Sequence, residues 1–592
     1  MSKKVITIFR QLCSILTAGQ KWLAVVVLLC SLMGALLETL GVSIISPLVS
    51  VLMDPEELMK ASYVQKIGEF FSISDYSRMM YFIGGGVIAL YLFKNVFFIF
   101  LSWVRSKYSC KVVRELSVEM MSSYMKRGYI FFTNHNTSEL INGVIVDVGS
   151  VYLIIGNGLK IIVDLLTIAL ICVYMVIKDT KLALIVMVLA GVCLALVLKI
   201  FRKSMLTSGE LYRKYNMEAQ QTLLHAFQGI KDVIIFDKRE FFQNEYNKNY
   251  TLQQQENVKR TIAGESPAYI IEGVCVCGLL LAVLGQAAVS DNPSGMVATL
   301  AAFAIGAFRI LPSLGRISNE MNVVLYSIKG LKCVYENVRE AREYENKRSV
   351  ELEKGQKDGI NQPDFQSELT IRNLSFAYPG QESDVLHQLN MTIPKGQSTA
   401  FIGQSGAGKT TLMDIILGLL EPKSGGVYFD ETNIKQLDKA WHSIIGYVPQ
   451  SVYLADDTIR FNVAFGEERA NVDDEKVWKA LEQAQLKKFV ESLPKGLDTY
   501  VGEQGVRFSG GQRQRMAIAR ALYFDPQILV LDEATASLDT ETESAVMQSV
   551  ELLQGELTII IVAHRLTTIR NCDVIYEIKD GSAVIRNKEE LF

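Results

Sequence analysis

The chain is 592 residues long, 49% of its residues are hydrophobic, and its formal net charge is only −3. One hydrophobic core does not organise a chain of this length, so we expect several domain-sized units. A nearly neutral chain lacks the basic surface that neutralises nucleic-acid phosphates, which excludes nucleic acid as a partner. Apolar residues are concentrated in the first 311 positions, and the remainder has the composition of a soluble domain. We therefore expect the first part of the chain to lie in a membrane and the remainder to lie in water.

Residues 1–21 are predicted to form an amphipathic helix that lies at the cytoplasmic membrane interface. Polar residues interrupt this segment and no cleavage-type ending follows it, which argues against a signal peptide. Its apolar residues recur at helical spacing: Val5, Ile6, Phe9, Leu12 and Leu16.

Six later segments are long enough to span a membrane, since roughly 20 apolar residues cross a ~30 Å hydrocarbon core. They run near 22–53, 80–103, 152–177, 182–200, 267–289 and 296–311. Long charged connections join the second span to the third and the fourth to the fifth. Basic residues flank the span ends on the side of these long connections. Both termini and the long connections are therefore predicted to be cytoplasmic.

Each long connection holds few glycines or prolines, so we expect two helices that extend the spans into the cytoplasm. The tips of these helical arms are predicted near 134–139 and 210–216. The spans and arms together predict an all-α transmembrane domain of six helices over residues 22–338.

A soluble domain follows the membrane segments. Residues 339–366 are charged and poor in aromatic residues, which indicates a solvated linker. Residues 367–592 alternate short β-rich runs with helical patterns, which is typical of an α/β layer fold. The predicted fold class is thus a multidomain chain in which a helical membrane domain precedes an α/β nucleotide-binding domain.

A G-x4-G-K-[ST] loop carries the first part of the predicted chemistry, because it follows the strand-like STAFI and precedes a helix-like apolar run. Its glycines allow backbone N–H groups to turn inward and bind phosphates at a helix N-terminus. Lys409 is expected to contact the β and γ phosphates of ATP, and the Thr410 hydroxyl to bind Mg²⁺. The residues expected to contact the nucleotide here are Gly403, Gln404, Ser405, Gly406, Ala407, Gly408, Lys409, Thr410 and Thr411.

Two adjacent carboxylates, Asp532 and Glu533, follow the apolar strand-like run that begins at Ile528. Open α/β sheets bind ligands at the carboxyl ends of their strands. Asp532 is therefore predicted to hold Mg²⁺, and Glu533 to act as the general base that activates water. The alternative is that both acids merely cap the following helix.

The segment from Phe508 to Gln512 resembles the LSGGQ signature of ATP-binding cassette (ABC) proteins, with phenylalanine in place of leucine. The resemblance implies that Ser509, Gly510, Gly511 and Gln512 contact nucleotide. Further segments resemble the other motifs of this family, in order: Tyr378 the adenine-stacking aromatic, Gln450 the Q-loop, Ser537-Leu538-Asp539 the D-loop, and His564 the switch histidine. It also implies that Gln450 contributes to the metal site and, with His564, to catalysis.

In this family two cassettes face each other, so the resemblance implies that the signature of one chain completes the γ-phosphate site of another. A chain with one cassette is then expected to work as a dimer. Two copies of this chain are the simpler arrangement, because each composite site would hold all catalytic residues; a homologous half-transporter as partner stays open.

Residues Thr499–Gly505 resemble a stretch typical of exporter cassettes, and segments 129–140, 229–242 and 265–272 are similar to bacterial lipid-linked oligosaccharide flippases. The resemblance implies an ATPase in a bacterial inner membrane, among membrane lipids, that moves a lipid-linked or amphipathic substrate outward by alternating access. A peptide or multidrug exporter is the alternative, and a nucleotide-gated channel or regulator is the alternative from another class.

Charged residues within or beside the spans are the only direct indications of cargo, because burying charge in a membrane is costly and often functional. Lys160 and Asp164 are four residues apart, so they either neutralise each other or serve cargo. Lys94 either bonds within the bundle or extends to the interface, and Glu38 either contacts cargo or makes a structural hydrogen bond. The residues of this group are Glu38, Lys94, Lys160, Asp164 and Glu272.

Overall fold

The computed structural model describes residues 2–53, 76–178, 180–287, 293–355, 363–381, 383–437, 439–534, 540–563 and 565–591. The chain divides into two compact units. The first, called here the helical unit, contains residues 1–127 and 135–345; the second, called the cassette unit, contains residues 128–134 and 346–592.

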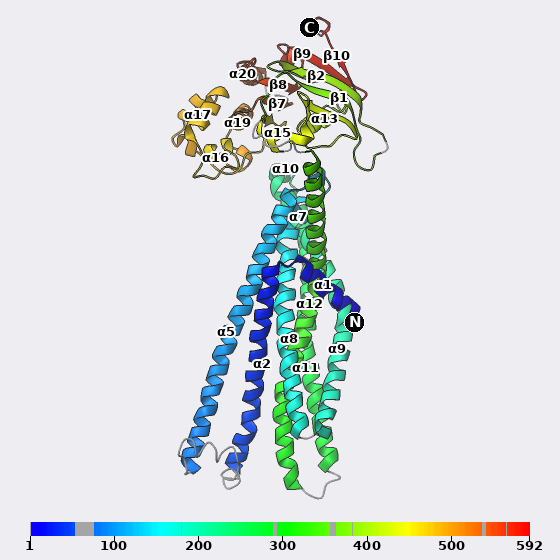
Figure 1. Ribbon diagram of the computed structural model, residues 1–592, viewed down its shortest axis with the longest axis vertical. Coiled ribbons are helices and arrows are strands. Elements are labelled where there is room, and N and C mark those ends of the chain that lie inside the picture. The colour runs from blue at the N-terminus through cyan, green and yellow to red at the C-terminus, as the bar shows by residue number, and fades with distance from the viewer. Residues whose placement is uncertain are drawn as a thin grey trace. The chain divides into compact units, whose positions relative to one another are not determined.

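The helical unit is built from long helices that run side by side (Figure 1). A short helix α1 (Ser2–Ile15) precedes them. The long helices are α2 (Ala18–Met53), α5 (Tyr76–Met125), α8 (Val148–Lys178), α9 (Thr180–Gln228), α11 (Arg239–Ala287) and α12 (Pro293–Gly355). Short helices connect them: α7 (Thr137–Asn142), a π-helical turn (Gly143–Asp147) and α10 (Ile230–Ile235).

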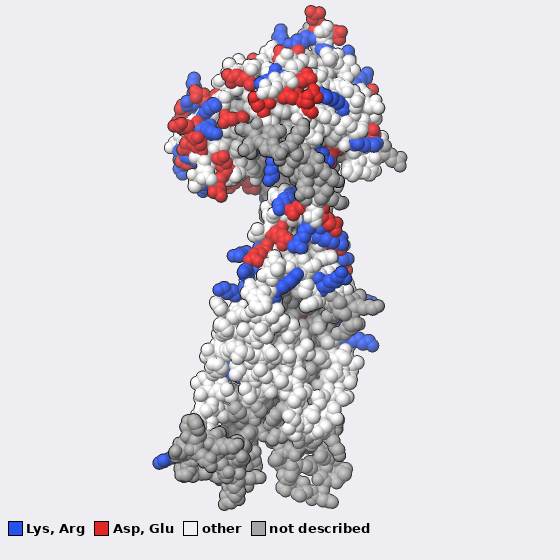
Figure 2. Space-filling model, viewed as in Figure 1, with Lys and Arg blue, Asp and Glu red and all other residues white. Residues whose placement is uncertain are grey.

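Each long helix carries one of the six expected spans, the fifth as far as Ala287, so the predicted helical fold class is confirmed. Three stretches among the described residues are long and apolar enough to cross a membrane: Ala18–Gly41, Arg78–Met125 and Thr137–Ile177. A 50-residue helix such as α5 extends about 75 Å, which exceeds the bilayer thickness. On the face shown in Figure 2, charged side chains are sparse along the lower part of this unit and frequent along its upper part. The helices therefore continue as charged arms beyond the spans.

The positions of the arm tips differ from the expectation in one case. The first turn, between α5 and α7, adjoins the predicted region 134–139. The predicted tip at 210–216 is wrong, because α9 runs unbroken to Gln228 and the turn follows at 229–238. Polar residues in 210–216 resemble a loop in the sequence. In the structure Arg213 and Asn216 are instead bonded to Asp147 and Asn142 of the neighbouring segment.

Helix α12 does not end with the helical unit's last span. It continues to Gly355, so residues 339–355 of the predicted linker are helical. Charged side chains one turn apart support this extension, as in the 3.5 Å ion pair between Arg339 and Glu343.

The cassette unit contains two sheets. The four-stranded antiparallel sheet has the order β2-β1-β4-β5. Its strands are β1 (Glu368–Phe376), β2 (Leu386–Pro394), β4 (Ser424–Phe429) and β5 (Thr432–Asn433). The six-stranded sheet has the order β10-β9-β3-β8-β7-β6, and only β10 is antiparallel to its neighbour. Its strands are β3 (Ser398–Ile402), β6 (Ile445–Val448), β7 (Ile528–Asp532), β8 (Thr558–Val562), β9 (Val574–Lys579) and β10 (Ser582–Ile585).

Helices complete this α/β unit, and two hydrophobic cores fill it. In the chain, α13 follows β3 and precedes β4. In space, α16, α17 and α19 lie together on the side of the unit away from β1 and β2 (Figure 1). The helices are α6 (Tyr129–Thr133), α13 (Lys409–Ile416), α14 (Ile434–Leu437), α15 (Lys439–Ser443), α16 (Ile459–Val463), α17 (Asp474–Gln483), α18 (Lys487–Glu491), α19 (Gly510–Tyr523), α20 (Thr540–Glu551) and α21 (Leu566–Ile569). Although α6 lies in the arm segment of the chain, Ile130 packs against the core of this unit.

The strand arrangement determines where the candidate site lies. Because β3, β8, β7 and β6 are parallel neighbours, their carboxyl ends meet at one edge of the sheet. The segments that leave this edge carry the phosphate loop after β3, Glu533 after β7 and Gln450 after β6.

Candidate nucleotide-binding site

The glycine-rich loop follows β3 directly and turns into α13. Gly403, Gly406 and Gly408 have φ angles of 147°, 82° and 99°, which residues with a side chain rarely adopt. A Cβ atom on Gly403 would lie 2.2 Å from the carbonyl oxygen of Ile578. The loop conformation therefore requires these glycines.

The loop also presents backbone donors that no protein group uses. Among the described residues, the N–H groups of Ser405, Gly406 and Gly408 have no protein acceptor. They lie at the N-terminal end of α13, where the helix dipole is positive. Free N–H groups at such a helix end are suited to bind phosphate oxygens.

Lys409 is buried beside this loop, with 4% of its surface exposed. Its Nζ donates to the carbonyl oxygens of Gly403 and Gln404, each at 2.9 Å. Burial lowers the pKa of Lys409, and the negative charges of Glu533 and Asp532 oppose that change. A buried ammonium group between loop carbonyls and two carboxylates can bind a phosphate group.

The two carboxylates lie at the carboxyl end of strand β7, which β8 separates from β3: Asp532 is the last residue of β7 and Glu533 follows it. Asp532 is 7% exposed, and Glu533 adopts a left-handed φ of 46°, which is uncommon for a residue with a side chain. A backbone hydrogen bond of 3.0 Å from the Glu533 N–H to the Val562 carbonyl oxygen holds this conformation. The Gln450 side-chain amide donates to Oε2 of Glu533 at 2.6 Å. The structure thus brings together the predicted catalytic residues Gln450 and Glu533.

Two further ionisable residues lie near Asp532, and sequence reasoning missed them. Burial and the charge of Asp532 raise the pKa of Asp414 on α13 to about 6. Burial also raises the pKa of Tyr447 on β6, with Asp532 and Asp414 contributing. Their positions in the sequence could have indicated them. Asp414 follows Lys409 on the same helix, and Tyr447 lies shortly before Gln450 in the chain.

Tyr378 is connected to the helix that carries the lysine. Its hydroxyl lies 3.0 Å from Oγ1 of Thr411, and its ring packs edge-on against Phe376 at 5.0 Å between centroids. Thr411 is 6% exposed, whereas Thr410 is exposed. The Thr410 hydroxyl is therefore the one accessible to a bound ion.

The signature residues begin helix α19. Ser509 and Gln512 form a capping box, in which the Ser509 Oγ accepts from the Gln512 N–H at 3.3 Å and the Gln512 Oε1 accepts from the Ser509 N–H at 2.9 Å. Phe508 is 6% exposed and lies in the hydrophobic core. Within the described part of the chain, no hydrogen bond or ion pair joins residues 509–512 to the phosphate loop. Ser537–Asp539 and His564 lie outside the described residues.

In the helical unit, Glu38 and Lys94 form an ion pair of 3.0 Å between α2 and α5. Their side chains are 20% and 6% exposed. Of the two expectations for Lys94, the structure agrees with the one that places its bond within the bundle. Glu38 is its partner.

Asp164 does not pair with Lys160, so the predicted neutralisation within one helix is wrong. Arg316 of α12 donates to Asp164 of α8, with Nη2 at 2.6 Å and Nε at 3.2 Å from Oδ1. A guanidinium group on a facing helix makes this two-pronged contact, which a lysine ammonium cannot make. Lys160 instead lines a cavity, and Glu272 is exposed on α11.

The cassette residues fit a nucleoside triphosphate with Mg²⁺. The free loop N–H groups and buried Lys409 suit phosphates. Mg²⁺ prefers oxygen ligands, takes few of them from the protein and shares substrate phosphates. The Thr410 hydroxyl, the Gln450 amide oxygen and the Asp532 carboxylate are oxygen donors of this kind.

The fold and the site define a membrane protein with a phosphate-loop nucleotide-binding unit. Residues 24–310 match the family described as the ABC transporter transmembrane region, and residues 386–536 match the family described as ABC transporter. The two matches cover most of the chain. The chain belongs to the ABC transporters, and it is an ATP-driven half-transporter of the exporter type.

Relatives show how far the similarity extends. The chain is 29% identical over 506 residues to the ATP-dependent lipid A-core flippase of Photorhabdus laumondii, covering 84% of each chain. It is 28% identical over 515 residues to the protein of the same name from Salmonella typhimurium, again covering 84% of each. ABC transporter B family member 21 of Arabidopsis thaliana is 40% identical over 240 residues, but these cover 40% of this chain and 18% of that protein.

The structure of a bacterial Atm1-family ABC exporter with ATP bound is similar over the whole fold. The TM-score is 0.75, and the alignment covers 97% of this chain and 96% of that chain. At 21% sequence identity, this similarity establishes the fold and confirms the predicted fold class.

Proposed function

We propose that two copies of this chain form an ATP-hydrolysing exporter or flippase that moves an amphipathic lipid out of the inner leaflet by alternating access. The observation that carries this proposal is the hydrogen bond between Gln450 and Glu533 beside the phosphate loop. Similarity over 84% of the chain to proteins named lipid A-core flippases supports the lipid class of substrate.

Glu533 acts as the general base in this proposal. Its Oε2 accepts a hydrogen bond from the Gln450 side-chain amide, and its carboxylate is proposed to take a proton from the attacking water. The left-handed backbone at Glu533 aims the carboxylate, since the bond to Val562 holds it. His564 is also proposed to contribute to catalysis.

Lys409 and the loop donors bind the phosphates, and Tyr378 stacks on the adenine. Thr410, Gln450 and Asp532 hold Mg²⁺, which neutralises charge on the phosphate oxygens when bound. The loop residues that contact nucleotide are those from Gly403 to Thr411, and the signature residues that contact it from the second copy are Ser509, Gly510, Gly511 and Gln512.

The dimer follows from two features of one copy. The signature residues begin α19 without bonding to the phosphate loop of their own chain within the described residues. The tip helix α10 also exposes a group of large apolar side chains, which is costly unless a partner covers them. They are Ile230, Ile234, Ile235 and Phe236, and they are 45% to 73% exposed. We infer that α10 docks on the second copy.

The proposed location is a bacterial inner membrane, with both termini cytoplasmic. Basic residues flank the spans on the side of the termini and arms, as expected for cytoplasmic segments. The flippase relatives named above are bacterial.

The test uses the full-length protein reconstituted in lipid vesicles. Glu533→Gln removes the proposed base but keeps the size of the side chain, so ATP hydrolysis should fall by about 10²-fold or more while ATP binding is retained. ATP-dependent movement of a labelled lipid should stop as well. Glu421→Gln is the matched control, because Glu421 is 74% exposed and pairs with Lys435.

Hydrolysis and lipid movement at the wild-type rate in Glu533→Gln would show that another group is the base. If the wild-type protein hydrolyses ATP but moves no lipid, the proposed ATPase activity would stand and the proposed flippase activity would be refuted.

A further inference from the structure

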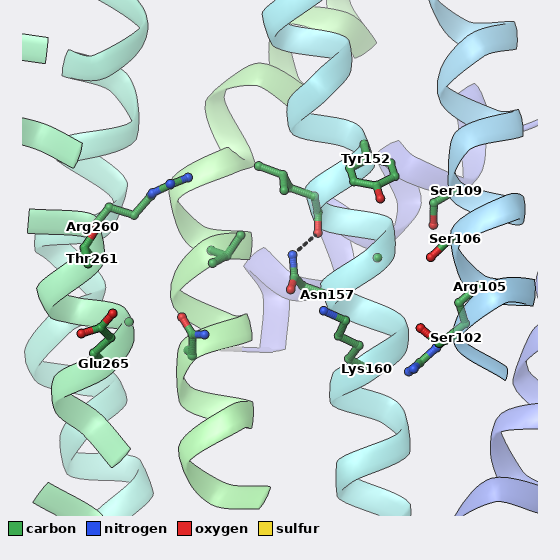
Figure 3. Close-up of a pocket in the computed structure, with 15 residues that line it drawn as sticks. Ser102, Arg105, Ser106, Ser109, Tyr152, Asn157, Lys160, Arg260, Thr261 and Glu265 are labelled. Atoms are coloured by element: carbon green, nitrogen blue, oxygen red, sulfur yellow. Dashed lines mark hydrogen bonds between the residues drawn. The ribbon is translucent and has the colours of Figure 1, made fainter. Parts of the chain in front are cut away.

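A cavity of about 520 Å³ lies within the helical unit, between α5, α8, α11 and α12. Figure 3 shows side chains from α5, α8 and α11 directed into the space between these helices. The cavity is therefore formed by residues that are far apart in the sequence. None of them takes part in the nucleotide site.

Three cationic side chains line the cavity: Arg105, Lys160 and Arg260. Among the described residues, none of them forms an ion pair, although Arg260 lies over the Tyr326 ring at 5.3 Å. Glu265 is the carboxylate in the lining. The lining thus has three positive groups against one negative group.

Other charges near the cavity do not cancel this excess. Asp164 is bonded to Arg316, so that pair is neutral. Glu320 is 6% exposed and interacts electrostatically with Arg105 and Lys160. With Glu320 counted as ionised, the cavity and its surroundings still have an excess of positive charge. Unpaired charge in a membrane unit is costly, which favours an anionic ligand.

One face of α5 adds hydroxyl groups to the cations. Ser102, Ser106 and Ser109 recur at intervals of four and three residues, so they lie on the same helix face as Arg105. Ser109 is 2% exposed, and its Oγ has no hydrogen-bond partner. A buried hydroxyl without a partner costs free energy, and a ligand oxygen would satisfy it.

The cavity lies where the spans end on their cytoplasmic side. Residues 102–109 include the end of the second span, 152–160 begin the third, 260–265 precede the fifth and 319–323 follow the sixth. This level is where lipid headgroups of the inner leaflet lie, and the apolar spans continue from it. A ligand with an anionic headgroup and apolar chains matches both environments.

We propose that this cavity recognises the phosphate headgroup of the transported amphiphile, with Arg105, Lys160 and Arg260 binding the phosphate oxygens and Ser109 donating a hydrogen bond. Phosphate matches these three cations. Each arginine guanidinium group can donate two parallel hydrogen bonds to two phosphate oxygens, and the lysine ammonium group adds a point charge. This inference rests on the proposed function, since it assumes that the cavity receives cargo.

The test measures binding to the full-length protein in a neutral detergent without ATP. Phosphatidic acid should bind at least about tenfold more tightly than diacylglycerol with the same acyl chains, because only the phosphate differs. Arg105→Gln and Lys160→Gln should each weaken phosphatidic acid binding about tenfold and leave diacylglycerol binding unchanged.

Lys107→Gln is the matched control. Lys107 is on α5 near Arg105, but it lies over the Trp103 ring at 4.8 Å and does not line the cavity. Its substitution should change neither lipid binding nor basal ATP hydrolysis.

Competition by inorganic phosphate distinguishes the source of the phosphate. Displacement of phosphatidic acid by inorganic phosphate would support recognition of the phosphate group alone, as in a soluble ester. Failure to displace it would support recognition of a lipid headgroup.

Equal binding of phosphatidic acid and diacylglycerol, or equal losses in Arg105→Gln and Lys107→Gln, would overturn the inference. ATP-driven transport is measured separately on the wild-type protein. Lipid transport without phosphate-selective binding would refute the headgroup site but leave the proposed flippase function standing. Phosphate-selective binding without ATP-driven transport would refute only the flippase function.

Discussion

The cassette unit and the helical unit assemble their sites in different ways. In the cassette unit, short segments that follow the carboxyl ends of strands in one sheet supply Lys409, Gln450 and Glu533. In the helical unit, four long helices supply single residues such as Arg105 and Arg260. The first arrangement leaves contiguous motifs in the sequence, whereas the second leaves isolated charges.

The two units also use polar groups differently. Two extended hydrophobic cores fill the cassette unit, and its site residues lie at their edge. The helical unit instead buries polar contacts between helices, among them the pairs Glu38–Lys94 and Asp147–Arg213. We therefore expect loss of one charge to be more damaging in the helical unit than a conservative change in the cassette core.

The largest expected effect is on Arg213. This guanidinium donates to both carboxylate oxygens of Asp147 at 2.9 to 3.1 Å, and the Asp147 side chain is 2% exposed. Arg213→Met leaves that carboxyl group buried without its partner, so the free energy of unfolding should fall by about 3 kcal/mol. Denaturant unfolding of the full-length protein in detergent measures it.

Arg339→Met provides the comparison, because Arg339 and Glu343 form an exposed pair on one helix. Its cost should be a few tenths of a kcal/mol. Adding Asp147→Asn to Arg213→Met should restore part of the stability, since no charge is then buried. Equal losses in the two single variants would show that the buried pair does not stabilise the arms.

This difference between the units explains which features the sequence predicted. The phosphate loop and the Asp532–Glu533 pair were recognisable because each motif is local and its strand or helix context adjoins it. The contact between Gln450 and Glu533 depends on strands β6 and β7 being neighbours, which the sequence order does not state.

Contacts between helices were harder to predict. Lys160 and Asp164 have helical spacing, but the position of Arg316 on another helix decides the partner of Asp164. The polar residues of 210–216 predict an arm tip, because the sequence does not distinguish a polar residue of a buried interhelical network from a solvated one. In the sequence, Arg105 is one of several basic residues beside a span. Its spacing from Ser102, Ser106 and Ser109 shows a shared helix face, but only the structure shows that this face lines a cavity.

A smaller effect is expected at Asp414 in the cassette unit. The pKa of this carboxyl is about 6 in the folded protein, and an unperturbed aspartate has a pKa of about 3.9. The folded state therefore keeps a proton that the unfolded state releases, and stability falls as the pH rises from about 4 to 6. Above that window, Asp414→Asn should raise the free energy of unfolding by about 1 kcal/mol after allowance for solvent screening.

The measurement is unfolding of nucleotide-free, full-length protein from pH 4 to pH 8. The gain in Asp414→Asn should shrink towards pH 4, where the folded wild type is protonated and the unfolded wild type is about half protonated. Asp456→Asn is the control, because Asp456 is exposed in the same unit. A gain that does not depend on pH would show that the charge of Asp414 is not its cause.

The smallest effect on ATP hydrolysis is expected for a conservative change at Phe508, the position where the signature departs from leucine. Its side chain is 6% exposed, and its ring packs edge-on against Phe489 with 5.7 Å between centroids. Phe508→Leu keeps an apolar residue in the core but loses this ring contact, so the free energy of unfolding should fall by about 1 kcal/mol. ATP hydrolysis should change less than about twofold, since Ser509 and Gln512 keep their capping box and α19 still begins at Gly510.

Phe508→Ser separates the two roles of this position, because it buries a hydroxyl in the core and leaves a cavity. We expect a loss of stability of about 3 kcal/mol or more, and a loss of hydrolysis that follows the fraction of folded protein. If Phe508→Leu instead reduced hydrolysis strongly at unchanged stability, the phenylalanine would be part of the nucleotide site. In that case the Phe508 side chain would act through contact with the second copy of the chain and not through packing in the hydrophobic core.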